Sequence, residues 1–315
     1  MRSIIFVVTV AMVLRCSSQT KLEASITNTL VETHITTLAA DEMQGRKAGT
    51  EGIEKAAQYI ESEFKRLDLK TFQGASDYRQ RFKKRGLDLF NVIGVLEGTT
   101  KKEEFVVISG HYDHLGILPT KNGDSIANGA DDDASGVAGV LAMAKYYKEN
   151  ANNKRTLIFI AFTAEEMGLW GSNYFGTTIR PENYIAGINL EMIGKYSKFG
   201  SNTAFLTGFD SSSFGKIIQK NLKGFAFVLY PDPYKEFRLF FRSDNASLAK
   251  LGIPAHTFST CPIDKDPYYH TVDDEIETLD IPTITHTIHA VVKGTESIIQ
   301  GIDTPTRVKS NSRYN

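Results

Sequence analysis

Apolar residues recur along the chain in two patterns, one typical of helices and one typical of buried strands. Residues 52–67 and 135–148 place apolar side chains three and four positions apart, which predicts an amphipathic helix in each range. A last helix should begin after Asp280, because Pro282 then falls in its first turn, where an amide hydrogen is not needed. Three short apolar runs have the length of buried strands: residues 105–108, 157–162 and 188–190.

Strands that alternate with helices in this way predict an α/β fold, in which helices cover both faces of a sheet. Each of the three apolar runs ends in a cluster of polar residues. In open α/β sheets, functional residues gather just beyond the carboxyl ends of the strands. We therefore expect the polar clusters to meet at one edge of the sheet and to form the functional site.

The beginning of the chain has the pattern of a signal peptide. Residues 4–14 are almost wholly apolar and follow Arg2, and they are too few to span a bilayer as a helix. We predict that residues 1–18 direct export, to the periplasm, the outer membrane or the exterior. A lipoprotein anchored at Cys16 is a second interpretation, although Arg15 is a poor match to the small residue that such processing prefers. A buried strand or a first core helix is the third.

The composition excludes several classes of protein. The chain has 36 Lys and Arg against 37 Asp and Glu, so a broad basic surface for nucleic acid is not expected. Two cysteines cannot build a disulfide framework, and Cys261 would be a lone thiol if Cys16 is cleaved away. No repeat or linker interrupts residues 25–300, so we expect residues 19–315 to form a single domain. We also expect a monomer.

Five polar segments carry the residue types of a metal site. An isolated acidic pair such as Glu165 and Glu166 is usually a solvated surface feature. Here, however, the carboxylates directly follow runs that look like buried strands, and burying several anions without counter-charge is costly. Two divalent metal ions would neutralise them, and carboxylates with imidazoles suit zinc. The segments are residues 109–114 (SGHYDH), 128–136 (NGADDDASG), 163–168 (TAEEMG), 189–194 (NLEMIG) and 268–274 (YYHTVDD).

In this order and spacing, the segments resemble those of peptidase family M28, which comprises co-catalytic zinc aminopeptidases and related glutamate carboxypeptidases and glutaminyl cyclases. The resemblance begins near Leu38, in LAADEMQGRKAGTEG, and continues to the region of Asp280. GHYDHLG, GADDDASG and AEEMGLWGS are specific in combination. The resemblance implies a three-layer α/β/α sandwich with a mixed, mostly parallel central sheet of about eight strands.

The same resemblance assigns the metal ligands. Asp132 would bridge two zinc ions, with Asp131 and Asp133 structural, and the peptide bond between Asp132 and Asp133 is a candidate for the family's cis form. Glu191 departs from the family, which has an aspartate there. The longer side chain can still bind a metal, but it could move that metal, shrink the pocket for the substrate amine, or cost the first metal site. The implied ligands are His111, Asp132, Glu166, Glu191 and His270.

Four further residues have implied roles in the reaction. Glu165 matches the general base that takes a proton from the attacking water, and Asp113 matches the carboxylate that orients the first metal's histidine. Tyr269 would donate a hydrogen bond to the oxyanion or, alternatively, only pack. Arg242 resembles the arginine that shapes the substrate end of the site, with a surface ion pair as the other interpretation. His114 lies just outside the ligand pattern and is interpreted as structural.

Together these residues predict a metallo-aminopeptidase that removes N-terminal residues from peptides with two zinc ions. The intact GADDD segment disfavours the alternative of a single-zinc glutaminyl cyclase. A carboxypeptidase relative would need basic residues for a substrate carboxylate, and Arg238 and Arg242 are present but not diagnostic. A catalytically inactive binding protein should have lost ligands, whereas only Glu191 is altered. Aromatic residues between positions 225 and 241 indicate either an apolar pocket wall or packed core.

Overall fold

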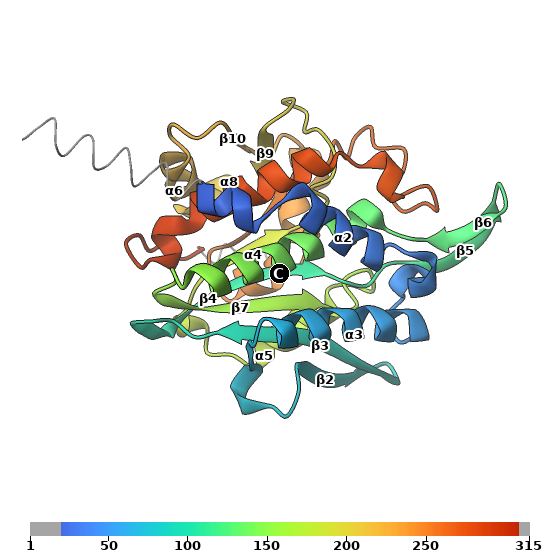
Figure 1. Cartoon of the computed structure of the whole chain (residues 1–315), viewed down its shortest axis with the longest axis horizontal. Helices are drawn as coiled ribbons and strands as arrows, with labels where there is room; N and C mark the ends of the chain where they lie inside the picture. Colours follow the sequence, from blue (N-terminus) through green and yellow to red (C-terminus); the bar gives the residue numbers. More distant parts are fainter. Residues whose placement is uncertain (1–19, 309–315) are drawn as a thin grey trace, which may run out of the picture.

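Within residues 20–308, which the computed structural model describes, a mixed sheet of nine strands lies at the centre (Figure 1). The four central strands run parallel to one another, and most of the outer pairings are antiparallel. The predicted fold class is therefore confirmed. In order across the sheet the strands are β1 (Lys70–Thr71), β3 (Leu87–Leu96), β7 (Arg155–Phe162), β4 (Lys101–His111), β8 (Tyr184–Leu190), β11 (Ala255–Ser259), β9 (Thr203–Leu206) and β10 (Val228–Pro231), and β2 (Arg79–Lys84) pairs with β3.

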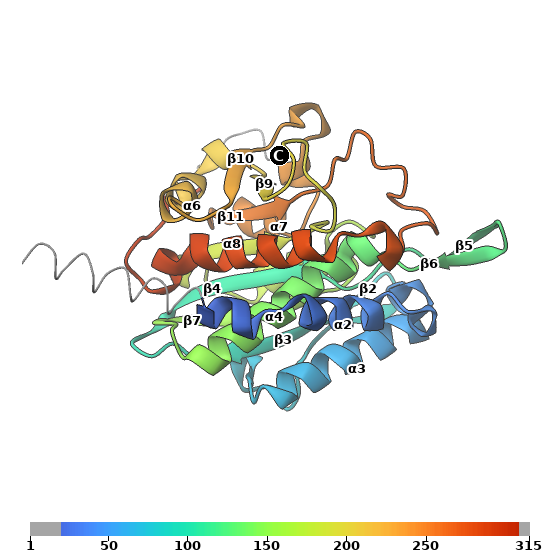
Figure 2. The same ribbon diagram turned by 45° about the horizontal axis from the view of Figure 1, so that its top comes forward.

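Helices cover both faces of the sheet, as Figures 1 and 2 show. The first face is covered by α2 (Asn28–Leu38), α3 (Glu51–Arg66), α4 (Gly136–Asn150) and α8 (Ile281–Ile299). The second face is covered by α5 (Trp170–Thr177) and α7 (Asn245–Lys250), while α6 (Phe214–Asn221) packs against α8 and β10. Helix α4 is central in its layer, because it contacts β4, β7 and β8 as well as α2, α3 and α8.

The elements predicted from the apolar pattern are present, with small differences in their bounds. Residues 52–67 correspond to α3, and residues 135–148 correspond to α4. Helix α8 begins as predicted: Asp280 caps it by accepting a hydrogen bond from the Thr283 amide at 2.8 Å, and Pro282 lies in the first turn. The three apolar runs are parts of β4, β7 and β8, and β7 is buried along its whole length because helices cover both of its faces.

The parallel strands β4, β7 and β8 end at one edge of the sheet, so the polar segments that follow them meet there. β4 ends at His111, β7 ends three residues before Glu165, and β8 ends one residue before Glu191. A hairpin of β5 (Gly116–Lys121) and β6 (Asp124–Ala127) projects beyond this edge (Figure 1). An ion pair between Lys121 and Asp273 ties the hairpin to the segment that contains His270.

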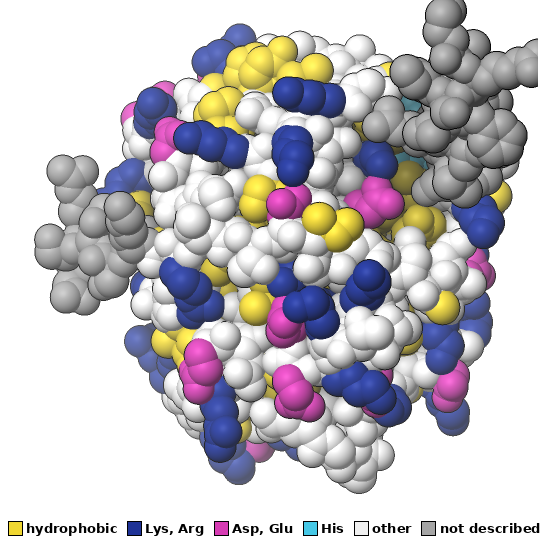
Figure 3. All heavy atoms as spheres, turned by 90° about the vertical axis from the view of Figure 1, so that its left-hand side faces the viewer, with side chains coloured by type: hydrophobic (Ala, Val, Ile, Leu, Met, Phe, Trp, Pro, Cys, Tyr) yellow, Lys and Arg dark blue, Asp and Glu magenta, His cyan; other side chains and the backbone are white. Residues whose placement is uncertain are grey.

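The opposite end of the molecule has a different character. In Figure 3, which looks onto this end, basic and acidic side chains are interspersed across the surface. Several of the described lysines form ion pairs with nearby acids, for example Lys293 with Glu296 at 2.6 Å on α8. Buried aspartates are instead concentrated near the carboxyl edge of the central strands, where His111 and His114 are also buried.

The predictions for the beginning of the chain lie outside the described residues. These are the signal peptide over residues 1–18 and the lipid anchor at Cys16. None of the helices between residues 20 and 308 combines the length and the apolar character needed to cross a membrane.

Candidate metal centre

His111 stands at the end of β4 with one ring nitrogen directed at the backbone and the other at Asp132. Its Nδ1 lies 3.0 Å from the main-chain carbonyl oxygen of Asp113, so Nδ1 carries the hydrogen and donates it. The other nitrogen, Nε2, is buried and lies 3.1 Å from Oδ1 of Asp132. Burial opposes a charged His111, but Asp132 and the neighbouring acids raise its pKa above the ordinary value. An imidazole that donates from Nδ1 and directs Nε2 at a buried carboxylate has the arrangement of a metal ligand once a metal ion displaces the Nε2 proton.

Asp132 faces a different imidazole with each of its two oxygens. Oδ1 faces His111, and Oδ2 lies 3.3 Å from Nε2 of His270. The carboxylate is buried, as is the loop that carries it. The peptide bond between Asp132 and Asp133 is cis, which confirms that prediction. The two oxygens of Asp132 thus face two different imidazoles rather than one.

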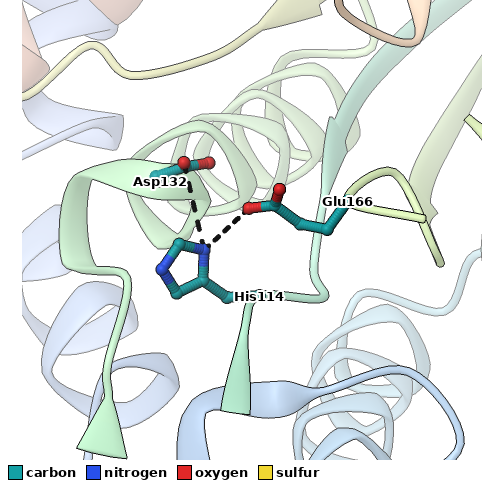
Figure 4. Close-up of side chains that lie close together, drawn as sticks. All are labelled: His114, Asp132 and Glu166. Atoms are coloured by element: carbon teal, nitrogen blue, oxygen red, sulfur yellow. Dashed lines mark hydrogen bonds and ion pairs between the residues drawn. The ribbon is translucent and has the colours of Figure 1, made fainter. Parts of the chain in front are cut away.

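Glu166 lies on the Oδ2 side of Asp132, between two histidines. Its Oε2 is 3.1 Å from Nε2 of His270, and its Oε1 is 3.0 Å from Nδ1 of His114 (Figure 4). Potential ligand atoms of His114, Asp132 and Glu166 all lie within 4.8 Å of one another. His114 therefore belongs to the centre, although its position in the sequence indicated a structural role.

The charges of this group fit a bound cation. Burial opposes a charged His270, but hydrogen bonds with Asp132 and Glu166 raise its pKa to about 10. Burial likewise opposes a charged Asp132, yet the imidazoles of His111 and His270 hold its pKa well below the ordinary value. The carboxylates thus favour positive charge beside them, and a zinc ion with these carboxylate and imidazole donors would supply it.

Glu165 and Glu191 complete the acidic group. Burial, followed by the negative charges of Glu191 and Asp244, raises the pKa of Glu165 well above its ordinary value. Burial also raises the pKa of Glu191, whose Oε2 accepts a long hydrogen bond of 3.4 Å from Asn189. A carboxyl group with a raised pKa is suited to exchange protons near neutral pH.

Three aspartates hold the backbone around these side chains. Asp113 accepts hydrogen bonds from the amides of Glu165 and Glu166, at 3.0 and 3.3 Å, and its carboxylate lies 3.9 Å from His111 Nδ1. It is thus the main-chain carbonyl of Asp113 that orients the imidazole, while its carboxylate fixes the two glutamates. Asp131 accepts from the Gly194 amide at 2.7 Å, and Asp133 accepts from the His111, Gly136 and Met192 amides at 3.0 to 3.2 Å.

A buried arginine that the sequence analysis did not single out joins the loops of the site. The guanidinium of Arg46 donates to the carbonyl oxygens of Tyr112 at 2.9 Å, Asn128 at 2.5 Å and Gly129 at 2.9 Å. These carbonyls flank the segments of His111 and Asp132. Arg46 lies in LAADEMQGRKAGTEG, so membership of that motif was the only available signal in the sequence.

A small cavity of about 50 Å³ opens beside Glu191. Tyr269 and the exposed Arg242 line it, and the Tyr269 ring stacks on His270 with the ring centroids 3.9 Å apart. The guanidinium of Arg242 donates to Oη of Tyr269 at 3.4 Å. The cavity therefore lies directly against the metal centre and has a cationic group at its border.

The aromatic residues between positions 225 and 241 do not line this cavity, so the structure agrees with the packed-core interpretation. Of the residues between 225 and 241, Leu239 lines the cavity, whereas Tyr234 and Phe240 are buried in the core. Arg238 packs over the Phe241 ring and is not among the lining residues. The wall consists of Met192, Phe205, Leu239 and Ile263.

Curated proteins that resemble the chain include peptidases. A probable zinc metalloprotease of Pyricularia oryzae is 34% identical over 113 residues, which are 36% of this chain and 21% of that protein. A probable leucine aminopeptidase of Arthroderma otae is 27% identical over 240 residues, which are 73% of this chain and 61% of that protein. The chain thus spans less than two thirds of the length of either relative.

Solved structures with the same fold include an aminopeptidase and a glutaminyl cyclase. The LapA aminopeptidase of Legionella pneumophila superposes with a TM-score of 0.73 at 20% identity, covering 92% of this chain and 76% of LapA. A glutaminyl cyclase of Porphyromonas gingivalis superposes with a TM-score of 0.68 at 16% identity, covering 87% of this chain and 99% of the cyclase. At these identities the likeness concerns the fold alone.

The family is decided by a direct match to the sequence. The model of peptidase family M28 matches residues 91–295, which include all five polar segments completely. The resemblance inferred from the motifs is therefore confirmed, as is the class of metallopeptidase at the level of the family. This chain belongs to peptidase family M28.

Proposed function

We propose that this protein is an aminopeptidase that removes N-terminal residues from peptides with two zinc ions and with Glu165 as general base. The observation that carries the proposal is Asp132, whose two oxygens face His111 and His270 separately. A carboxylate shared between two donor groups is what a two-metal hydrolytic site requires. His111 and Glu191 would complete one metal position, and Glu166 and His270 the other.

The chain's own residues supply the proton transfer and the orientation. Zinc ions at this centre would lower the pKa of a water molecule and polarise the scissile carbonyl. Glu165, with its raised pKa, would accept a proton from the attacking water and deliver it to the leaving amine. Tyr269, which lies against His270, would donate a hydrogen bond from Oη to the oxyanion.

The cavity beside Glu191 supports an exopeptidase that accepts one side chain. Its wall of four apolar residues suits an apolar N-terminal residue, and Glu191 at its inner end would face the substrate's amine. Arg242 at the border would contact the substrate chain. A single-zinc cyclase remains the second candidate, because a glutaminyl cyclase shares the fold, but it would leave one oxygen of Asp132 without a metal.

We also propose that residues 1–18 direct export and that residues 19–315 act as one monomeric domain. The support is the apolar run behind Arg2 and the one central nine-stranded sheet within the described residues. The lipid anchor at Cys16 is the alternative to a cleaved, secreted form.

The test combines activity with metal content. Aminoacyl-nitroanilides with a free amine should be hydrolysed, their N-acetylated counterparts should not, and chelation should abolish activity that zinc restores. Glu165→Gln should lose activity by about 10²- to 10⁴-fold with both zinc ions still bound. Wild-type rates in Glu165→Gln would refute the general base, and one zinc per fully loaded chain would favour the cyclase-like candidate.

A further inference from the structure

His114 makes a specific contact with a metal-binding carboxylate. Its side chain is fully buried, and its Nδ1 lies 3.0 Å from Oε1 of Glu166. The other oxygen of Glu166, Oε2, lies 3.1 Å from Nε2 of His270. The two oxygens of Glu166 are therefore engaged on different sides, one by each histidine, and Figure 4 shows His114 directed between Glu166 and Asp132.

The surroundings of the ring indicate which nitrogen carries the hydrogen. Nε2 of His114 is buried without a hydrogen-bond partner. A hydrogen on Nε2 would leave a buried donor unpaired and would direct the lone pair of Nδ1 at the carboxylate of Glu166, and both are unfavourable. A hydrogen on Nδ1 instead forms a charge-assisted bond to Oε1 and leaves only an acceptor unpaired. His114 is thus a donor toward Glu166, and a protonated Nδ1 cannot also bind a metal.

Close packing against Gly129 and a main-chain hydrogen bond hold the His114 ring in this position. Gly129, at a φ of +57°, packs so closely that a Cβ atom there would lie 2.6 Å from Cγ of His114. The main-chain amide of His114 donates to the carbonyl oxygen of Arg46 at 3.3 Å. Because backbone and ring are both constrained, the direction of the Nδ1–H bond is fixed before any ligand binds.

We propose that His114 is a positioning residue of the metal centre, whose Nδ1–H holds Oε1 of Glu166 so that Oε2 faces the metal position beside His270. The inference rests on the zinc site that is part of the function proposed above. Partners that orient a metal-binding carboxylate commonly contribute 10- to 100-fold to metal affinity, so about that loss is expected without His114.

The experiment compares three substitutions of the full chain. An asparagine amide occupies roughly the place of Nδ1, whereas a glutamine amide occupies roughly that of Nε2. His114→Asn should therefore keep a donor toward Glu166 and bind zinc within a few-fold of wild type. His114→Gln and His114→Ala should weaken one of the two zinc equivalents by about 10- to 100-fold. Zinc affinity is measured by competition with a chromophoric chelator, independently of activity.

Cobalt(II) in place of zinc separates positioning from direct ligation. If His114 only positions Glu166, the visible spectrum of cobalt-loaded His114→Asn should match that of wild type. A spectrum altered alike in His114→Asn and His114→Ala would make His114 a ligand and overturn the proposal. Unchanged zinc affinity in His114→Gln or in a folded His114→Ala would overturn it as well.

Two controls make the outcome specific. His34→Ala removes another buried imidazole, one that is hydrogen-bonded to Tyr59 at 2.7 Å rather than to a residue of the metal centre, and should leave zinc affinity unchanged. If His114→Ala does not fold, the Asn and Gln variants still decide the question. A wild-type protein that binds two zinc ions but hydrolyses no peptide would refute the proposed function while leaving the affinity measurements on His114 valid.

Discussion

Two buried acidic clusters lie side by side in this molecule and differ in what neutralises them. The open cluster consists of Asp132, Glu166 and Glu191, and imidazoles are its neighbours. The closed cluster consists of Asp131, Asp266 and Asp274, and it contains an ammonium group. In each cluster, potential ligand atoms of three residues lie within 4.8 Å of one another. In the open cluster these residues are His114, Asp132 and Glu166. In the closed cluster they are Asp131, Cys261 and Asp266.

Lys195 is the counter-charge of the closed cluster. Its Nζ lies 2.6 Å from Asp266, 3.5 Å from Asp131 and 3.9 Å from Asp274. Burial opposes the charge on Lys195, but Asp131 and Asp266 raise its pKa above the ordinary value. A cation of the protein itself therefore occupies the place that a metal ion would take, which makes this cluster structural despite its suitable ligands.

The two clusters are also mechanically linked. Asp274 of the closed cluster accepts hydrogen bonds from the amides of Asp131 and Asp132, at 3.0 to 3.2 Å. The cluster that has its own cation thus fixes the backbone of Asp132, the residue that we propose bridges two metal ions in the other cluster. A group of buried acids therefore does not by itself identify a metal site. What distinguishes the two clusters is whether the protein supplies its own cation, as Lys195 does in the closed cluster.

The largest expected difference between the clusters concerns two adjacent aspartates. Asp132→Asn should lose zinc from both positions and reduce peptidase activity by on the order of 10³-fold or more, because the bridging charge is gone. Asp131→Asn should keep both zinc ions and mainly lower the free energy of unfolding. Metal analysis and urea unfolding on both variants check this, and two tightly bound zinc ions in Asp132→Asn would abolish the distinction between the clusters.

The next largest effect is expected at Lys195. Lys195→Met leaves three buried carboxylates without their cation and should lower the free energy of unfolding by about 3–5 kcal/mol. Lys198→Met, three residues later, removes an exposed ammonium near the Tyr234 ring and should cost less than about 1 kcal/mol. Urea unfolding of the chelated proteins gives both values. A loss of similar size in the two variants would contradict the role assigned to Lys195.

The open cluster was predictable from sequence and the closed one was not. His111, Glu166 and Glu191 follow apolar runs, so the ends of parallel strands bring them together. Lys195 has no such signal, because its partners lie more than sixty residues away in sequence and no periodic pattern marks them. The same holds for Arg46, whose bonds to Tyr112 and Gly129 span 66 and 83 residues.

His114 illustrates a different limit of sequence reasoning. Its position beside the ligand motif was visible, but its role depends on the direction of one ring nitrogen. That direction follows from the packing of Gly129 and from the loop that Arg46 holds. Chain topology can therefore be inferred from periodicity, whereas the contacts that orient the ligands depend on side-chain packing between distant loops.

The pH dependence of stability should differ between metal-free and zinc-loaded protein. Without metal, folded His270 keeps its proton up to about pH 10, whereas an unfolded histidine loses it near 6.5. The folded state binds more protons in that window, so the free energy of unfolding should fall as the pH rises from about 6.5 to 10. Zinc displaces the proton, so the free energy of unfolding of the zinc-loaded protein should not fall in this way. The difference in free energy of unfolding between the zinc-loaded and the metal-free protein should therefore widen as the pH rises.

Thermal unfolding with and without chelator across this window checks that prediction. His270→Gln, which cannot take up the proton, should flatten the slope of the metal-free protein. If the stability of the metal-free wild type rises with pH between 7 and 10, then Asp132 and Glu166 do not stabilise a protonated His270 as described.

The smallest expected effect is at Glu191, where the chain departs from the aspartate usual in its family. The site has formed around the longer side chain: Glu191 reaches the cavity, and its Oε2 remains 3.4 Å from Asn189. Glu191→Asp withdraws the carboxylate by one methylene and should weaken one zinc equivalent by up to about tenfold, less than the loss of a whole ligand. It should also enlarge the cavity, so KM for bulky N-terminal residues should fall relative to small ones. Tighter zinc binding in Glu191→Asp would instead mean that the glutamate strains the open cluster.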